Sequence, residues 1–422
     1  MLFQTYGKTL LSIFLIGLFI VSFSYIFNEY FQKQQQQQKI ITYAQKQITF
    51  NGTNQSSGNE LSNALLKQFK TKALKQLSSN SSNKTSFYNS SIPISIVVGI
   101  VNTNGTQVSG YGNISSSVNK KVDGNTVFDI ASIEKTFVTT ILADMVKQGL
   151  VNLDDPVEKY LPSNNVTVPM YKGHKITLKD LATHTSGLPD FPAGWIRNHT
   201  YTTQQVYDFI SNTSLSSQPG NKADYSDIGM GLLGHILSLR ADVPFDKLVK
   251  DRILDVLEMN STGTGMNATG ISIPEDIKSR FAKGHIDGKE VNLEFIPEAI
   301  QSAGAMYSTT NDMLKYLSAN MGLIHTKIND VIQQTHLIIH SFGAPYNNKS
   351  LMQDYIGLGW TVTTDFGKEV IWHTGSIDGY TSIIGFNPSK QIGLVILCNS
   401  DISNLSPKEM LDLVVPFLLY YK

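Results

Sequence analysis

Cysteine and surplus charge are the two features that this sequence most clearly lacks. Cys398 is the single cysteine among 422 residues, so no disulfide bond can form within the chain. It lies in an apolar stretch typical of a buried strand, where a thiol is a small core residue rather than a nucleophile or a metal ligand. Lysine plus arginine and aspartate plus glutamate number 34 each, and no basic stretch stands out, which argues against nucleic acid as a partner.

Sequence motifs for common cofactors are missing as well. There is no His-Glu-x-x-His motif, no pair of Cys-x-x-Cys motifs and no glycine-rich phosphate loop. We therefore predict that the protein uses neither a metal ion nor a nucleotide and needs no cofactor. A chain of this length can form one large domain or two smaller ones with a substantial core.

The longest apolar run lies near the N-terminus, at residues 9–27, and no charge interrupts it. A helix of this length, at about 1.5 Å per residue, is close to the hydrocarbon thickness of a bilayer. The run ends in aromatic residues at 25–27 rather than in a small-residue cleavage site, which favours a retained single-pass anchor over a cleaved signal peptide. Lys8 precedes the run and Lys33 and Lys39 follow it, so the sequence leaves the orientation open.

The anchor divides the chain into four predicted regions. They are a short tail at 1–8, the transmembrane anchor at 9–27, a polar linker or stalk at 28–58 and a folded domain at 59–422. The linker contains a glutamine run and is mostly polar, so it has no core of its own. Several Asn-x-Ser/Thr sequences are compatible with export. We expect a cell-membrane protein that contacts the lipid bilayer through its N-terminal helix and has an extracytoplasmic catalytic domain.

Hydrophobic periodicity predicts strands at both ends of the folded domain and helices between them. We expect helices at 60–77, 228–239, 245–257 and 407–420, and strands at 94–101, 108–111, 357–363, 370–373, 381–387 and 392–399. From the end of the helix after Ser132 to about residue 300 we expect helical or irregular structure. This order predicts an α+β fold, in which one antiparallel sheet forms from both ends of the chain, is flanked by helices and carries an inserted, mostly helical lobe. The cleft between the lobes would hold the site.

Ser132 and Lys135 form a Ser-x-x-Lys motif at the start of a predicted helix. A spacing of three residues puts both side chains on one face, and a serine hydroxyl becomes a good nucleophile when a nearby base takes its proton. The same pattern occurs at 81–84 and 117–120, but only Ser132 leads an apolar helical run, which ends at Gly149. Taken alone, the motif is more typical of a surface serine and lysine at the start of an ordinary helix.

Three further segments complete the pattern along the chain: His184–Pro189, Tyr225–Asp227 and His373–Ser376. Each alone fits an ordinary structural role. Together with Ser132 and Lys135 they resemble the serine β-lactamase and penicillin-binding protein superfamily, and most of all its class C-like branch, which includes esterases and D-aminopeptidases. The resemblance covers roughly residues 60–422. Ser132-x-x-Lys135 matches the nucleophile motif of that superfamily.

The remaining motifs match with substitutions. Tyr225-Ser226-Asp227 lies where the superfamily has Tyr-x-Asn, and His373-Thr374-Gly375 lies where it has Lys-Thr-Gly or, in many relatives, His-x-Gly. The resemblance implies a β-lactamase/transpeptidase-like fold. It also implies that Ser132 attacks a carbonyl and forms an acyl-enzyme, while Lys135 and Tyr225 share the acid and base roles.

The resemblance also implies a set of supporting residues: Asp227, His373, Thr374, Gly375 and Ser376. Backbone N–H groups of Ser132 and Ser376 are the expected oxyanion hole. Gly375 would let its strand approach the substrate closely, because it has no Cβ atom.

Two departures from the family pattern change the expected chemistry. Asp227 replaces an amide, and its carboxylate would raise the pKa of Lys135 and shift the role of base toward Tyr225. His373 replaces a permanent cation and is only partly charged near pH 7. We therefore predict a membrane-anchored serine hydrolase that acts on small-molecule esters or on small peptides and amides. The alternatives are a β-lactamase or D-Ala-D-Ala carboxypeptidase and, in another class, a catalytically silent membrane-tethered binding module.

Overall fold

A computed structural model describes ten segments of the chain. They are residues 59–79, 94–191, 193–196, 199, 201–267, 270–293, 296–342, 353–365, 367–400 and 407–421. They belong to a compact unit that spans Ser56–Lys422. The predicted tail, anchor and linker, at 1–8, 9–27 and 28–58, lie outside the described residues and stay predictions. Within the described segments, no helix combines the length and the apolar character needed to span a bilayer.

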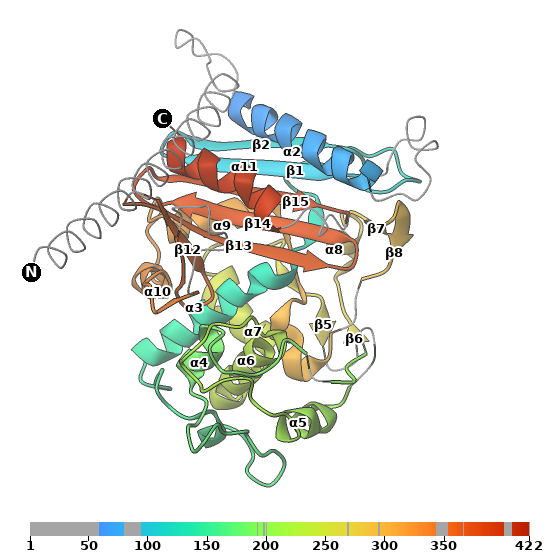
Figure 1. Cartoon of the computed structure of the whole chain (residues 1–422). Helices are drawn as coiled ribbons and strands as arrows, with labels where there is room; N and C mark the ends of the chain where they lie inside the picture. Colours follow the sequence, from blue (N-terminus) through green and yellow to red (C-terminus); the bar gives the residue numbers. More distant parts are fainter. Residues whose placement is uncertain are drawn as a thin grey trace, which may run out of the picture. The chain divides into compact units, whose positions relative to one another are not determined.

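One eight-stranded antiparallel sheet forms the larger part of the fold (Figure 1), in the order β10-β11-β12-β13-β14-β15-β1-β2. Its strands are β1 (Ile96–Asn102), β2 (Gly105–Tyr111), β10 (His340–Ser341), β11 (Gln353–Ile356), β12 (Thr361–Asp365), β13 (Lys368–Ile377), β14 (Tyr380–Asn387) and β15 (Ile392–Cys398). The first strand pairs with the last one, so that Ile96 lies opposite Cys398. The prediction of a sheet built from both ends of the chain is confirmed, and Cys398 is buried in it.

Helices cover both faces of this sheet. Helices α2 (Glu60–Ser79) and α11 (Pro407–Tyr420) lie against one face, and α9 (Thr310–Asn320) lies against the other (Figure 1). Glycines allow the close packing: a Cβ on Gly385 would approach Leu418 of α11, and one on Gly99 would clash with Thr310 of α9. Because both faces are covered, every residue of β14 and β15 is buried, and the sequence of β15 is continuously apolar.

Helix α3 (Glu134–Lys147) is the central helix of the molecule and follows Ser132 closely. Every residue from Glu134 to Ala143 is buried, because the sheet side and the helical lobe both pack against it. The lobe contains α4 (Leu178–Ala182), α5 (Thr203–Ser211), α6 (Asp227–Ala241) and α7 (Phe245–Val249), with α8 (Glu275–Lys278) and α10 (Asn329–Thr335) outside it. The mostly helical insertion is therefore confirmed.

Short strands interrupt the region that we expected to be helical or irregular, so that expectation was partly wrong. They are β4 (Gly263–Thr264), β5 (Met266–Asn267), β6 (Gly270–Ile271), β7 (Gly284–Ile286) and β8 (Lys289–Val291). The short strands β3 (Val127–Asp129) and β9 (Met306–Thr309) lie outside that region. β3, β9 and β4 form one small sheet. These strands have two to four residues, which is too short for a period-2 pattern to be visible.

The predicted strand at 357–363 was wrong over its first half. Residues 357–360 form a turn between β11 and β12, and Gly359 has a φ of +70°. A Cβ on Gly359 would lie 2.7 Å from Oγ1 of Thr139, so this turn packs directly on α3. The apolar residues of this stretch are buried by the turn and not by strand pairing.

Two further elements differ clearly in extent from the predictions. The predicted helix at 245–257 is the short helix α7 followed by a π-helical turn at Lys250–Leu254. The predicted strand at 370–373 continues to Ile377 as β13, so His373–Ser376 lie inside the strand. Tertiary pairing with β14 extends this strand, since Gly375 lies opposite Ser382.

Candidate active site

Ser132 lies in a single 3-10 turn, Ala131–Ile133, between β3 and α3. Ala131 has a φ of +46°, an uncommon conformation for a residue with a side chain, and its N–H donates to Oδ1 of Asp129 at 2.8 Å. The strained turn is therefore held by a buried carboxylate, and it projects Ser132 toward the opening between the sheet and the lobe.

Strand β13 packs on this turn from the sheet side. A Cβ on Gly375 would lie 2.3 Å from the carbonyl oxygen of Ile130 and 3.1 Å from Cβ of Ala131. The predicted reason for Gly375, close approach of the strand to a substrate, was thus incomplete. The glycine is required because the strand contacts the segment that carries Ser132.

The hydroxyl of Ser132 accepts hydrogen bonds from two side chains, and one of them lies far away in the sequence. Nζ of Lys135 donates to Oγ of Ser132 at 2.8 Å, and the hydroxyl of Tyr225 donates to the same oxygen at 2.8 Å. The acid and base roles that the resemblance implies for Lys135 and Tyr225 require both side chains to reach Ser132, and in the structure both do. This arrangement can move a proton from or to Oγ of Ser132.

Lys135 is fully buried and holds two further groups. Its Nζ forms an ion pair with Oδ1 of Asp227 at 2.7 Å and donates to the carbonyl oxygen of Ala303. Burial alone would lower the pKa of Lys135, but Asp227 and Tyr225 together raise the pKa above its ordinary value. Lys135 is therefore an ammonium group at neutral pH, as the carboxylate at Asp227 predicts.

Tyr225 lies at the mouth of the site, with 40% of its surface exposed. Loss of hydration around its hydroxyl raises the pKa of Tyr225 to about 12, while the charge of Lys135 acts in the opposite direction. Because the ring is partly exposed, water moderates this rise. The resting site at neutral pH accordingly holds a neutral phenol beside an ammonium group.

The segment Tyr225–Asp227 is fixed by the start of α6. Ser226 caps this helix: its Oγ accepts from the N–H of Gly229 at 3.0 Å and donates to the carbonyl oxygen of Pro189 at 2.6 Å. The N–H of Asp227 donates to Oδ1 of Asp190 at 2.9 Å. The His184–Pro189 segment and the residue after it thus hold the start of α6 in place.

His184 is a residue of the site to which the sequence analysis assigned no role. Its ring stacks on Tyr225, with centroids 4.5 Å apart and planes at 28°. Its Nδ1 accepts from the N–H of Ser226 at 3.2 Å. The sequence signal was the position of His184 at the start of a segment shared with the family, but nothing in the pattern indicated contact with Tyr225.

His373 lies in β13 near the charged pair and is buried. Its Nδ1 hydrogen-bonds to the carbonyl oxygen of Thr374 at 2.6 Å. Burial, reinforced by the charge of Lys135, lowers the pKa of His373 to about 4. The histidine is therefore neutral near pH 7, which is a stronger departure from a permanent cation than the sequence predicts. Thr374 is half-buried, and Ser376 is exposed at the pocket.

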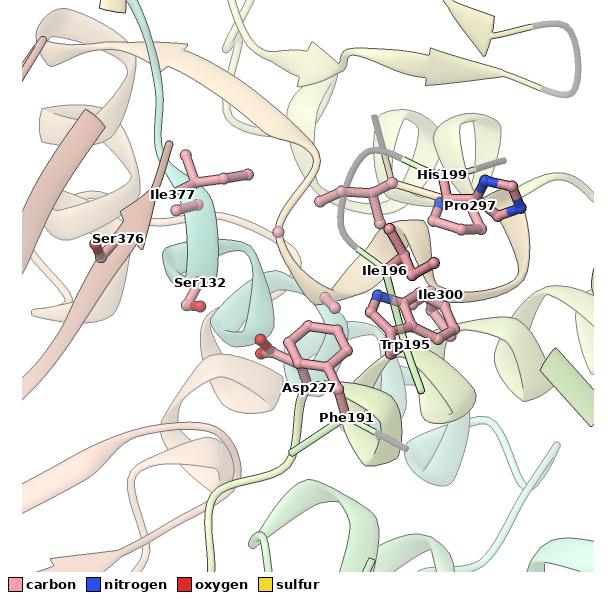
Figure 2. Close-up of a pocket in the computed structure, with 14 residues that line it drawn as sticks. Ser132, Phe191, Trp195, Ile196, His199, Asp227, Pro297, Ile300, Ser376 and Ile377 are labelled. Carbon is pink, nitrogen blue, oxygen red and sulfur yellow. The ribbon is translucent and has the colours of Figure 1, made fainter. Parts of the chain in front are cut away.

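The pocket beside Ser132 has two chemically different sides (Figure 2). Ser132, Asp227 and Ser376 contribute its polar side. An apolar wall faces them, formed by Phe191, Trp195, Ile196, Ile296, Pro297 and Ile300. The described lining residues include no lysine or arginine, and Asp227 is their only carboxylate. Among the described residues we also find no cluster of three or more His, Cys, Asp or Glu side chains that could hold a metal ion.

Aromatic stacking supports the apolar wall. The rings of Trp195 and Tyr201 stack with centroids 4.3 Å apart, and those of Phe191 and Trp195 with centroids 5.6 Å apart. Phe209 contacts both Trp195 and Tyr201 from α5. The sequence analysis missed this wall, because its residues come from two separate segments with no shared pattern.

Comparison with known proteins gives a consistent result. The sequence profile of the family described as Beta-lactamase matches residues 94–416. A beta-lactamase of Pseudomonas fluorescens is 27% identical over 345 residues, which cover 73% of this chain and 88% of that protein. The D-alanyl-D-alanine-carboxypeptidase/endopeptidase AmpH of Escherichia coli is 27% identical over 300 residues, which cover 68% of this chain and 74% of that protein.

Solved structures share the fold. A class C beta lactamase from Rhodobacter sphaeroides superposes with a TM-score of 0.64 at 22% identity, covering 82% of this chain and 99% of that chain. The beta-lactamase/D-alanine carboxypeptidase from Pseudomonas syringae gives a TM-score of 0.66 at 21% identity, covering 85% and 99%. The predicted β-lactamase/transpeptidase-like α+β architecture is thereby confirmed.

Proposed function

Since the chain belongs to the beta-lactamase family, within the serine β-lactamase and penicillin-binding protein superfamily, we propose that this serine hydrolase forms an acyl-enzyme on Ser132 and acts on esters or small peptides and amides. One observation carries the proposal: Oγ of Ser132 accepts hydrogen bonds from both Lys135 and Tyr225 at 2.8 Å. Such a constellation at the edge of a pocket can activate a nucleophile and protonate a leaving group.

The proposed proton transfers follow from the charge states of the site. Lys135 keeps its proton beside Asp227, so the base is the minor phenolate form of Tyr225, which the ammonium group of Lys135 stabilises. As the bond between Oγ and the substrate carbonyl carbon forms, the proton of Ser132 passes to this phenolate. The phenol then protonates the leaving oxygen or nitrogen. A water molecule hydrolyses the acyl-enzyme by the same route, and backbone N–H groups of Ser132 and Ser376 stabilise the oxyanion.

The charges around the pocket support uncharged substrates. Lys135 is neutralised by its ion pair with Asp227, and His373 has a pKa lowered to about 4. The described pocket lining includes His199 but no lysine or arginine that could hold a substrate carboxylate, whereas the apolar wall fits an apolar substituent. Both features favour neutral esters and amides over β-lactams that carry a carboxylate.

The relatives keep a second candidate open, because proteins named as a beta-lactamase and as a D-alanyl-D-alanine-carboxypeptidase each align with more than two thirds of the chain. A substrate panel separates the two. We expect a short-chain p-nitrophenyl ester to be hydrolysed with a higher kcat/KM than a chromogenic cephalosporin or a peptide ending in D-Ala-D-Ala. The reverse order would replace the ester assignment with the second candidate.

Active-site labelling tests whether the protein is a serine hydrolase or a silent binding module. A fluorophosphonate probe should label the wild type and fail to label Ser132→Ala, because only an activated serine reacts. Ser117→Ala is the matched control, since Ser117 belongs to another Ser-x-x-Lys sequence but is exposed. Absence of label from the wild type would favour the silent module.

We also propose that residues 9–27 anchor the protein in the cell membrane with the hydrolase domain on the extracytoplasmic side. The basis is the uncharged apolar run in the sequence. The full chain should stay with membranes after carbonate extraction, and a chain lacking residues 1–27 should be released. Protease added to intact cells should digest the domain, and a protected domain would overturn the sidedness.

A further inference from the structure

His184 contacts three consecutive residues around Tyr225, each with a different part of the histidine. Its carbonyl oxygen accepts from the N–H of Asp224 at 2.7 Å. Its ring face stacks on Tyr225 at 4.5 Å between centroids, and its Nδ1 accepts from the N–H of Ser226 at 3.2 Å. The histidine is 3% exposed, so these contacts are made inside the protein and not at its surface.

The backbone at His184 adopts an unusual conformation to make these contacts. Its φ is +54°, in the left-handed region that residues with a side chain rarely occupy. The preceding helix end supplies support, because the N–H of His184 donates to the carbonyl oxygen of Leu181 at 3.3 Å. Such a conformation is unfavourable by itself, and it persists where the surrounding contacts compensate for the strain.

The ring of His184 is neutral and carries its proton on Nε2. Nδ1 accepts a hydrogen bond, which assigns the proton to the other nitrogen. Burial, with smaller contributions from the charge of Lys135 and from His373, holds the pKa of His184 well below its usual value. Nε2 is buried and has no hydrogen-bond partner among the described residues. The ring of His184 therefore provides a flat surface for stacking and one hydrogen-bond acceptor, and it carries no charge.

We propose that His184 is a positioning residue for the reaction: its buried ring fixes the plane of the Tyr225 phenol so that the hydroxyl reaches Oγ of Ser132. This inference rests on the proposed function, in which Tyr225 transfers the proton. The need for such support is physical, because Tyr225 is 40% exposed and water alone would leave its ring free to turn. A displacement of about 1 Å at a proton-transfer group can reduce the rate by about 100-fold.

The main test replaces His184 with asparagine. Asparagine tolerates the left-handed backbone and offers Oδ1 as an acceptor for the N–H of Ser226, while the stacked ring is lost. We expect His184→Asn to lower kcat for a p-nitrophenyl ester by roughly 10- to 100-fold and to leave KM within about threefold. An unchanged kcat would overturn the proposal.

The matched control is His235→Asn. His235 is another neutral histidine that bonds to a tyrosine, with its Nε2 2.6 Å from the hydroxyl of Tyr207, and it lies outside the pocket lining. Burial lowers its pKa to about 4. Loss of this pair should leave kcat within about twofold of wild type. An equal loss of kcat in both variants would attribute the effect to general destabilisation and overturn the proposal.

A double-mutant cycle distinguishes positioning from a structural role. The rate of fluorophosphonate labelling is measured for His184→Asn, Tyr225→Phe and the double variant. If His184 acts through the Tyr225 hydroxyl, adding His184→Asn to Tyr225→Phe should slow labelling by less than about threefold. Losses that multiply would overturn the proposal. Failure of the proposed function looks different, since the wild type would then not be labelled, or Ser132→Ala would be labelled as fast as the wild type.

A second variant tests the contribution of the stacked ring by itself. His184→Phe keeps a ring against Tyr225 but removes the acceptor for Ser226, and its backbone strain lowers stability rather than activity. The folded fraction of His184→Phe should retain kcat within about threefold of wild type. A loss as large as that of Tyr225→Phe would overturn the proposal.

Discussion

The polar side of the pocket and the apolar wall are held together by different forces. On the polar side, contacts of 2.7–2.8 Å join Lys135 to Ser132 and Asp227, and Tyr225 to Ser132. On the apolar wall, Trp195 packs by ring stacking on its aromatic neighbours, and the hydroxyl of Tyr201 accepts from the N–H of Ile196 at 2.9 Å. A substitution on the polar side therefore changes the charge state of its neighbours, whereas one on the apolar wall should change only which substrate fits.

The largest expected effect is on the polar side, for Lys135→Met. Loss of the ammonium group removes the partner of Asp227 and the stabilisation of the Tyr225 phenolate. We expect kcat for an ester substrate to fall by roughly 100- to 10,000-fold. Lys147→Met on the same helix is the control, because its ion pair with Asp330 at 3.3 Å is exposed and contributes little. If Lys135→Met were as active as Lys147→Met, the proposed difference between the polar side and the apolar wall would be wrong.

A histidine outside the pocket should give the next largest effect, on stability. Burial lowers the pKa of His336 to about 3, so at pH 5 the folded protein leaves it neutral while the unfolded chain protonates it. The unfolded state binds the extra proton, so the free energy of unfolding falls as the pH drops from about 6.5 toward 3, by about 2 kcal/mol at pH 5.

Urea unfolding at pH 7 and pH 5 measures this difference. His336→Gln keeps a group that can bond to Asn320 but does not titrate, so the variant should lose less stability between the two pH values. His373, with a pKa lowered to about 4, adds to the same trend from the polar side. An equal loss in wild type and variant would contradict the prediction for His336.

A smaller effect should follow from Asp227→Asn, which restores the amide of the family pattern. The pKa of Lys135 should fall because its carboxylate partner is lost, and the new N–H group can donate to a substrate carbonyl. We expect kcat/KM for a chromogenic cephalosporin, relative to that for an ester, to rise by about tenfold. An unchanged ratio would indicate that Asp227 does not select against amides and lactams.

The smallest expected effect is on the apolar wall, for Trp195→Ala. Removal of the indole should lower kcat/KM for a butyrate ester by about threefold to tenfold and leave an acetate ester nearly unchanged, because only the longer acyl group reaches the wall. Leu337→Ala is the control, since that side chain is 58% exposed outside the pocket. Equal losses for both esters would show that Trp195 supports the whole site rather than one part of it.

Local patterns in the sequence predicted much of the fold. Apolar and β-branched runs located β14 and β15 closely, and apolar helical patterns located α6 and α11, because these elements bury most of their apolar residues. The short strands of the lobe and the turn at Gly359 were not predicted, because long-range packing decides them. The catalytic roles of Ser132, Lys135 and Tyr225 remain proposals, although their convergence was predicted.

The sequence by itself determined the proximity of Ser132 and Lys135, since a three-residue spacing at a helix start puts them on one face. It also determined that Asp227 puts a carboxylate where the family has an amide, which raises the pKa of Lys135. Only the tertiary structure decided that His373 is neutral, that Gly375 packs on the turn of Ser132 and that the ring of His184 stacks on Tyr225. Desolvation and close packing depend on which distant segments meet, and no local pattern of residues encodes that meeting.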